Sequence, residues 1–455
     1  MEKGNKKIIR GWVMYDWANS VYNLVISSAI FPIFYDIQTK QSYASSKGYL
    51  DATGKVDISQ IKEGEAIMIK FFGIELSSSV LFSFILSASF LVVSFLSPLL
   101  SGVADFTGSK KKFLRFFCYM GALSCMTLYL FDANRIELGM LSVFLTSIGY
   151  WNSLVFYNAF LPEIAEPKDH DRISARGFTM GYLGSMLLLI VCLAMIMSTS
   201  VGAEKMQYMR YAFILVGLWW IGFSQITYRA LPNNVYNKKT EKGFIWKGFR
   251  ELKLVFKEFK KTKRLKRYLL AFFFFNTGVQ TVMLMATIFA NKEIAWPKGS
   301  GSTGLIIAIL LIQILGALGA FIMSRVSSKI GNIRTLFISV SLWIVICLGG
   351  FFIKTPIEFY LLASSVGLVM GGVQAIARST YSKFLPETTD HASYFSFFDV
   401  TEKIGIVLGT LFFGLMEFWT GSIRYSVASV AFFFVFGLIF LMFVPKHERE
   451  LETQH

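Results

Sequence analysis

Long runs of apolar residues without a single charge recur along this chain of 455 residues, and Leu138–Pro162 and Tyr268–Asn291 are clear examples. A helix of roughly 20 residues crosses the ~30 Å hydrocarbon core of a bilayer, so runs of this length favour membrane spans. The sequence therefore predicts an all-α membrane protein with twelve transmembrane helices, at residues 12–35, 78–102, 113–132, 138–161, 178–200, 211–230, 268–290, 303–324, 335–353, 358–380, 398–420 and 425–444. The eleventh span is the weakest, because Glu402, Lys403 and Glu417 interrupt it.

The composition excludes several other classes of protein. Charged residues make up only 16% of the chain, whereas soluble domains usually carry about a quarter. The net charge of +16 does not indicate nucleic-acid binding, because 13 of the 45 Lys and Arg residues lie in Lys238–Arg267 and most others flank apolar runs. The four cysteines and four histidines lack metal-ligand spacing, and the chain has no ATP-binding phosphate loop. We expect no metal, no cofactor and no nucleic-acid partner.

The distribution of basic residues predicts the orientation in the membrane. If the N-terminus is inside, 33 Lys and Arg residues belong to inner segments and 12 to outer ones. Basic residues concentrate on the cytoplasmic side of membrane proteins. We therefore expect a multi-pass protein of the cell membrane with both termini in the cytoplasm.

A basic segment divides the chain into an N-terminal half at residues 1–231, a linker at 232–267 and a C-terminal half at 268–455. Apolar residues in the linker follow helical spacing, with lysines on the other face: Phe249, Leu252, Val255, Phe256 and Phe259. This pattern predicts an amphipathic helix that lies either on the inner leaflet or against the cytoplasmic ends of the bundle.

The two halves share a repeated motif. Phe160-Leu161-Pro162-Glu163 follows the fourth span, and Phe384-Leu385-Pro386-Glu387 follows the tenth, 224 residues later. An Asp-His pair follows each copy. Both copies have the same place and orientation in their half, which is the plan of the major facilitator superfamily, with two parallel six-helix halves.

The loop between spans two and three, Ser101–Lys112, combines an acid at a helix end, a turn glycine and a basic run. Asp105 can accept hydrogen bonds or face the N-terminus of a neighbouring helix, where the helix dipole favours an anion. The loop resembles the signature loop of the major facilitator superfamily through Asp105, Gly108, Lys110 and Lys111, but Ser101, Phe106 and Ser109 depart from that signature. The resemblance implies that the loop latches the two halves together on the cytoplasmic side. The alternative is an ordinary short basic loop.

A narrower resemblance extends over nearly the whole chain. It rests on Tyr15-Asp16-Trp17-Ala18-Asn19-Ser20, Asn158-Ala159-Phe160-Leu161-Pro162, Gly181-Tyr182-Leu183-Gly184-Ser185, Gly278-Val279-Gln280-Thr281 and Gly372-Val373-Gln374-Ala375. Together these motifs resemble the unknown-major-facilitator-one family, which is related to the yeast vacuolar amino-acid effluxers of autophagy. The resemblance implies a secondary transporter, and amino-acid export is one activity it suggests.

Polar residues form helical stripes in four of the predicted spans, and in the superfamily these four spans line the central cavity. Polar groups inside a membrane normally face protein or a water-filled path. The alternative is that the amides only pair between helices, at about 0.6 kcal/mol each. The candidate substrate path consists of Asp16, Asn19 and Asn23 in span one, Trp151, Tyr157 and Asn158 in span four, Asn276 and Gln280 in span seven, and Gln374 and Arg378 in span ten.

This set of side chains suits a small polar or zwitterionic solute. Arg378 would bind a carboxylate, Asp16 would bind an ammonium group or carry a proton, and Trp151 and Tyr157 would contact apolar parts. Because Asp16 lies near the start of the predicted span, it is alternatively a simple helix cap.

The sequence thus predicts a secondary transporter that works by alternating access and carries a small-molecule substrate. We expect it to act as a monomer in the lipid bilayer, with protons as a candidate coupling ion. An intramembrane enzyme, a channel and a non-transporting sensor remain alternatives. Against an enzyme, the predicted spans hold no His and no nucleophile–base pattern.

Overall fold

The computed structural model of the protein describes residues 3–445 except 52, 63–64, 235–243 and 298–300. Among these residues, twelve helices are long and apolar enough to cross a membrane. The twelve spans predicted from the sequence are therefore confirmed. Most of them are longer than predicted, because the helices continue past the apolar runs at their ends. The eleventh span, the weakest prediction, is a complete helix, His391–Thr420.

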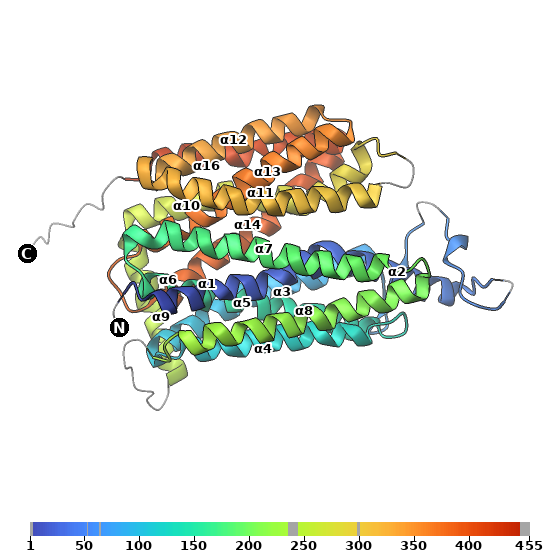
Figure 1. The fold of residues 1–455 in the computed structure, drawn as a ribbon, viewed down its shortest axis with the longest axis horizontal. Helices are drawn as coiled ribbons and strands as arrows, with labels where there is room; N and C mark the ends of the chain where they lie inside the picture. Colours follow the sequence, from blue (N-terminus) through green and yellow to red (C-terminus); the bar gives the residue numbers. More distant parts are fainter. Residues whose placement is uncertain (1–2, 52, 63–64, 235–243, 298–300, 446–455) are drawn as a thin grey trace, which may run out of the picture.

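The helices form two groups that lie side by side (Figure 1). The first group contains α1 (Lys6–Val21), the π-helix η1 (Tyr22–Ile30), α2 (Phe31–Lys47), α3 (Ser78–Thr107), α4 (Lys110–Thr127), α5 (Ile136–Asn158), α6 (Leu161–Ile164), α7 (His170–Met197) and α8 (Gly202–Ala230). The second contains α10 (Lys263–Glu293), α11 (Gly301–Ile330), α12 (Asn332–Phe352), α13 (Pro356–Phe384), α14 (His391–Thr420), α15 (Ile423–Ser429) and α16 (Ala431–Met442). The exact boundaries 1–231, 232–267 and 268–455 stay a prediction.

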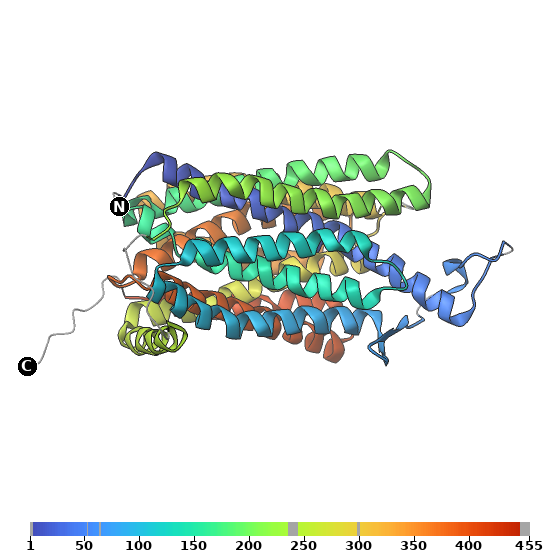
Figure 2. The same cartoon turned by 90° about the horizontal axis from the view of Figure 1, so that it is seen from below.

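The two ends of the bundle differ. We call the end at which α1 begins and α16 ends the terminal face. From the opposite end projects a segment with the 3₁₀ turn η2 (Ile58–Gln60) and a hairpin of β1 (Met68–Phe71) and β2 (Ile74–Ser77), whose register pairs Met68 with Ser77 (Figures 1 and 2). Two further 3₁₀ turns, η3 (Leu128–Leu130) and η4 (Pro167–Asp169), flank α5 and α7.

The first span begins earlier than the sequence predicted. Helix α1 begins at Lys6, and the side chain of Asn5 caps it by accepting hydrogen bonds from the backbone N–H groups of Lys7 and Ile8. Asp16 lies three turns further along the helix, so the interpretation of Asp16 as a helix cap is wrong. The span also contains the π-helical stretch η1, which the sequence pattern did not predict. A π-helix changes the angular spacing of side chains, so an α-helical stripe does not continue unbroken through it.

Helix α9 (Phe244–Lys261) lies at the terminal face in both views (Figures 1 and 2). Its backbone packs closely on α3, because a Cβ at Gly248 would lie 2.7 Å from Val103. Phe256 and Phe259 contact the ring of Phe397 on α14. The linker helix therefore packs against the bundle, one of the two arrangements the sequence left open, while its Trp246 side chain is exposed. Residues 235–243 of the linker lie outside the described residues.

The outside of the bundle is apolar, as a lipid-facing surface must be. Phe95 on α3, Val345 on α12 and Leu361 on α13 are each about two-thirds exposed. Contiguous apolar surface is costly in water but matches the hydrocarbon core of a bilayer.

Candidate functional site

A buried ion pair joins the two helix groups near the terminal face. Asp16 of α1 and Arg378 of α13 are 5% and 4% exposed, and Arg378 Nη2 lies 3.1 Å from Asp16 Oδ2. The hydroxyl of Tyr157 on α5 donates to the same carboxylate oxygen at 2.8 Å. The carboxylate and the guanidinium neutralise each other, which makes the burial of both charges tolerable.

Three further hydrogen bonds join Arg378 to the first helix group. Its Nε donates to Ser174 Oγ at 2.9 Å, and Nη2 donates to the Ser174 carbonyl at 2.9 Å. Its Nη1 donates to Asn158 Oδ1 at 3.3 Å. The guanidinium carbon lies 4.2 Å from the ring centre of Phe178 and 4.9 Å from that of Trp12. Arg378 of the second group is therefore bound to the first group by an ion pair, by hydrogen bonds and by cation–π contacts.

Gly177 of α7 leaves the space in which this ion pair forms. A Cβ built there would collide with Asp16 Oδ2 and would lie 2.8 Å from Arg378 Nη2 and 3.3 Å from Tyr157 Oη. Any larger residue would have to separate these groups.

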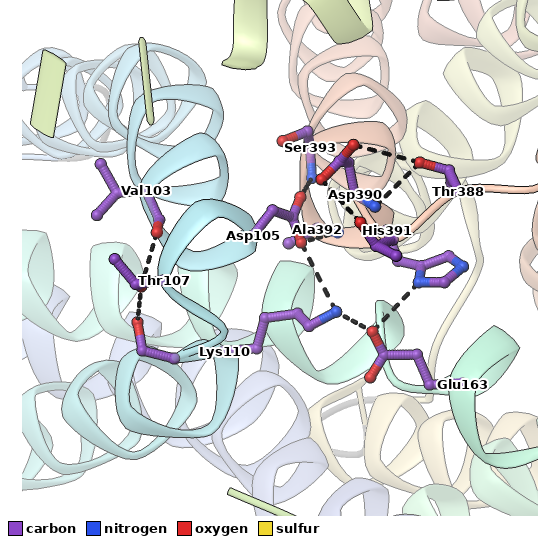
Figure 3. A network of polar contacts seen from close by, with 12 residues as sticks. Val103, Asp105, Thr107, Lys110, Glu163, Thr388, Asp390, His391, Ala392 and Ser393 are labelled. Atoms are coloured by element: carbon purple, nitrogen blue, oxygen red, sulfur yellow. Dashed lines mark hydrogen bonds and ion pairs between the residues drawn. The ribbon is translucent and has the colours of Figure 1, made fainter. Parts of the chain in front are cut away.

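A second contact between the groups centres on Asp105, at the end of α3 (Figure 3). Its carboxylate accepts hydrogen bonds from the backbone N–H groups of Ala392, at 3.2 Å, and Ser393, at 2.7 Å. These N–H groups belong to the first turn of α14, where helix amides have no partner within the helix. The anion also lies at the positive end of the helix dipole.

Lys110 extends this contact to the repeated motif. Its Nζ lies 3.6 Å from Asp105 Oδ1 and forms an ion pair with Glu163 of α6 (Figure 3). Glu163 Oε1 also lies 3.2 Å from Nδ1 of His391, at the start of α14. We call Asp105, Lys110, Glu163 and His391, with the first turn of α14, the Asp105 latch.

The other two residues predicted for the latch loop have structural roles. Gly108 ends α3 with a φ of 67°, a left-handed conformation that favours glycine, and a Cβ there would collide with Asn234. Lys111 donates from Nζ to the Leu231 carbonyl at 2.7 Å.

A third contact between the two groups joins α7 to the second group. Asp171, in the first turn of α7, accepts from Ser327 Oγ of α11 at 2.9 Å and from Asn332 Nδ2 at 2.7 Å. Lys383 of α13 lies 2.6 Å from the same carboxylate. Here the acid belongs to the helix whose N-terminus it occupies, whereas Asp105 reaches the N-terminus of another helix.

Trp151 and Gln280, two residues of the predicted substrate path, contact a charged cluster on α14. Lys403 Nζ lies 3.5 Å from the ring centre of Trp151 and 2.9 Å from Asp399 Oδ1. It also lies 3.4 Å from Glu402 Oε2, and Gln280 Nε2 donates to Glu402 Oε1 at 2.7 Å. We call Asp399, Glu402 and Lys403 the α14 triad.

Among the described residues, the side chains of the other four predicted path residues contact neither the Asp16–Arg378 ion pair nor the α14 triad. Asn19 and Asn276 are buried, and their side-chain nitrogens have no hydrogen-bond partner among the described residues. Gln374 Oε1 accepts from Tyr182 Oη at 2.7 Å, across the two helix groups. Asn23 lies in the π-helix and is exposed.

Several residues of these contacts were not among the predicted ones: Trp12, Glu163, Asp171, Ser174, Phe178, Asn332, Lys383, His391, Asp399, Glu402 and Lys403. The sequence did give a signal for the α14 triad, because charges inside an apolar span are rare and functional. Ser174 and Phe178 gave none, since similar residues occur on every span.

All hydrogen bonds between the two helix groups, among the described residues, lie toward the terminal face. They involve α7 only from Asp171 to Tyr182 and α13 only from Gln374 to Lys383. The protein is therefore closed between its two helix groups at this face.

Comparison with known proteins connects this architecture to a family. The chain matches the family described as vacuole effluxer Atg22 like over residues 4–454. This chain belongs to that family. It is 28% identical to the uncharacterized MFS-type transporter YxiO of Bacillus subtilis, over 98% of this chain and 96% of that protein. It is 24% identical to autophagy-related protein 22 of Saccharomyces cerevisiae strain S288c, over 96% of this chain and 90% of that protein.

Solved structures show that this Atg22-like chain has the major facilitator fold. The crystal structure of FucP in the outward conformation is similar with a TM-score of 0.67 and 13% identity, covering 98% of this chain and 99% of FucP. The proton:xylose symporter XylE is similar with a TM-score of 0.68 and 13% identity, covering 96% of this chain and 95% of XylE.

Fold and family together give the coarse function of the Atg22-like chain. It is a multi-pass membrane protein of the major facilitator superfamily and a transporter. The interpretation as an intramembrane enzyme is excluded, because its relatives and structural neighbours are transporters.

Proposed function

We propose that this transporter carries a small zwitterionic solute of the amino-acid class across the cell membrane by alternating access, in the direction of export. The main observation that supports this proposal is the Asp16–Arg378 ion pair between the two helix groups. The family description, vacuole effluxer, supports the direction of transport.

A zwitterion can replace both partners of this ion pair. Its ammonium group would bind Asp16 and its carboxylate would bind Arg378, and the charges of both residues would stay compensated. Removing only one partner of a buried ion pair costs about 3–5 kcal/mol, so a ligand with a single charge would leave one residue unpaired. The aromatic rings of Trp12, Tyr157 and Phe178 already surround the guanidinium and would contact the apolar part of the solute.

The substrate also supplies a reason for the conformational change. A ligand shifts a conformational equilibrium only by its difference in affinity for the two states. In the closed state Asp16 and Arg378 bind each other; a zwitterion that binds them separately favours the state in which the helix groups part. With both termini in the cytoplasm, as the basic residues predict, the closed terminal face is the cytoplasmic one. The moving bodies are then residues 1–231 and 268–455, joined by the linker 232–267, within a monomer.

Counterflow in proteoliposomes tests the proposal. Vesicles loaded with an unlabelled amino acid should accumulate the same labelled amino acid, and the matching amine without a carboxylate and acid without an ammonium group should not be exchanged. Arg378→Lys keeps the charge but loses the planar guanidinium, and should lower exchange at least tenfold.

The matched control is Arg424→Lys, an arginine of α15 that pairs with Glu293 in the same helix group and should leave exchange unchanged. Exchange of amines or acids as fast as that of zwitterions would overturn the assignment of substrate class. Specific binding without counterflow would favour a non-transporting sensor.

A further inference from the structure

The α14 triad places three ionisable side chains in the middle of a membrane span. Asp399, Glu402 and Lys403 lie two to three turns into the 30-residue helix α14. Lys403 is 1% exposed and the side chain of Asp399 is 7% exposed. Charged side chains at this depth are costly and are therefore rarely present without a function.

The triad holds one more acid than base. Lys403 contacts both Asp399 and Glu402, so one ammonium group serves two carboxylates. Glu402 has a second donor, Gln280. The other oxygen of Asp399, Oδ2, is buried and has no hydrogen-bond partner among the described residues. A buried carboxylate oxygen without a donor is costly, and a proton bound to it lowers that cost because a neutral carboxyl group is cheaper to bury than an anion.

We propose that Asp399 is the carboxyl group that binds and releases the transported proton, with Lys403 and Glu402 as the ion pair that remains when Asp399 is neutral. The proton comes from water on one side of the membrane, forms an O–H bond at Asp399 and returns to water on the other side. Electrons are not transferred, and no further reactant is needed. This inference adds a coupling ion to the proposed transport function.

The surroundings favour Asp399 over Asp16 as the proton carrier. Oδ2 of Asp16 accepts hydrogen bonds from the guanidinium of Arg378 and from the hydroxyl of Tyr157, whereas Oδ2 of Asp399 has no hydrogen-bond partner among the described residues. The titratable group facing the triad from α5 is Tyr150, which interacts with both Glu402 and Asp16. From α10 the triad receives the amide of Gln280. Asp105 of α3 lies at the first turn of α14, and the Lys292–Glu417 ion pair lies near its last turns.

The triad also links protonation to the movement of the two helix groups. Lys403 belongs to α14 in the second group, and its ammonium lies over the ring of Trp151 on α5 in the first group. When Asp399 is protonated, Lys403 loses one of its two anionic partners and shifts toward Glu402. The cation–π contact that spans the two groups then changes, and with it the preference for the closed or open state.

The fluorescence of Trp151 reports this change without any substrate. Purified protein in lipid nanodiscs is titrated from mildly acidic to mildly alkaline pH, and the signal of Trp151→Phe is subtracted from that of the parent. The parent should show a Trp151-dependent transition, because the position of an ammonium over an indole ring alters its emission. Asp399→Asn should abolish the transition. The matched control is Glu417→Gln, an acid of the same helix outside the triad, which should retain it.

A parent in which Trp151 fluorescence does not change with pH, or an Asp399→Asn variant that titrates like the parent, would overturn the proposal. A transition that depends on sodium concentration at constant pH would also overturn it in favour of a metal cation. Circular dichroism and size-exclusion profiles of each variant establish that it is folded; if Asp399→Asn does not fold, Asp399→Glu should shift the transition instead. Because the titration contains no amino acid, its outcome is independent of whether counterflow succeeds.

Discussion

At the scale of single residues, the closure of the protein depends on a few atoms brought from distant parts of the chain. Asp16 and Arg378 are 362 residues apart in sequence, and their ion pair has almost no contact with solvent. The ion pair requires space as well as opposite charges, because the two side chains can approach each other only where Gly177 has no side chain. A single methyl group at this position tests whether the ion pair matters for transport.

We expect Gly177→Ala to lower counterflow roughly tenfold or more, since each ~1.4 kcal/mol of lost stabilisation changes a population tenfold. The added Cβ would separate Asp16 from Arg378 while it leaves every charge in place. Gly222→Ala is the matched control, because nothing lies within 4 Å of a Cβ at that helical position. Alanine there should leave transport unchanged and stabilise α8 by up to about 1 kcal/mol. Equal counterflow rates for both variants would show that the ion pair has no role in transport.

At the scale of helices, two of the contacts between the groups are made at helix ends. Asp105 of α3 binds the N-terminus of α14, and Asp171 occupies the N-terminus of α7. Their partners are backbone N–H groups or side chains close to helix ends. Both contacts therefore form only when these helix ends are aligned. Such contacts form or break together as a helix moves, so they favour two discrete states over a continuous range.

Asp105→Asn should open the terminal face more often. The amide has only one acceptor oxygen for the two N–H groups of Ala392 and Ser393, and it lacks the charge that favours a helix N-terminus. Charge-assisted hydrogen bonds contribute about 1.5–3 kcal/mol. Ser393 is buried and its hydroxyl has no hydrogen-bond partner among the described residues, so Ser393→Cys provides a probe. A maleimide should label this cysteine at least tenfold faster in the Asp105→Asn background.

The control for this prediction is Asp169→Asn, whose carboxylate forms an exposed ion pair with Arg172 in its own helix region. This substitution should not change the labelling rate. The four native cysteines are buried and should contribute little background. If the labelling rate is the same with and without Asp105→Asn, the loop does not act as a latch and serves only as a basic topology signal.

At the scale of the whole molecule, the orientation of the bundle decides which side of the membrane the closed face meets. A reporter fused after His455, or inserted at Lys239, should report the cytoplasm. A reporter inserted at Ala52 should report the outside. The physical reason is the excess of basic residues in the segments on the side of the termini.

A cytoplasmic signal from the reporter at Ala52 would contradict this orientation and would make the closed face the outer one. The proposed direction of opening would then be reversed, whereas the Asp16–Arg378 contact itself would be unaffected. An external reporter at position 52 with cytoplasmic reporters at 239 and 455 would agree with the odd number of spans between 52 and 239.

The sequence by itself determined the class of fold and the identity of several important residues. Twelve apolar runs specify twelve spans, because a backbone in lipid must satisfy its own hydrogen bonds as a helix. Polar and charged side chains inside those runs, such as Asp16 and Arg378, stand out because they are costly there. These are local properties, and each can be read from a short stretch of chain.

Only the tertiary structure decided which of these side chains meet. Helical periodicity places Asp16 on a face of α1 but carries no information about the helix opposite, so separate roles were assigned to Asp16 and Arg378, which in fact bind each other. The same limit separated Trp151 and Gln280 from Lys403 and Glu402, their partners on α14. The π-helical stretch after Val21 was also not evident from the sequence pattern. Pairing between distant segments depends on the packing of all the helices together, and that information is in no single segment.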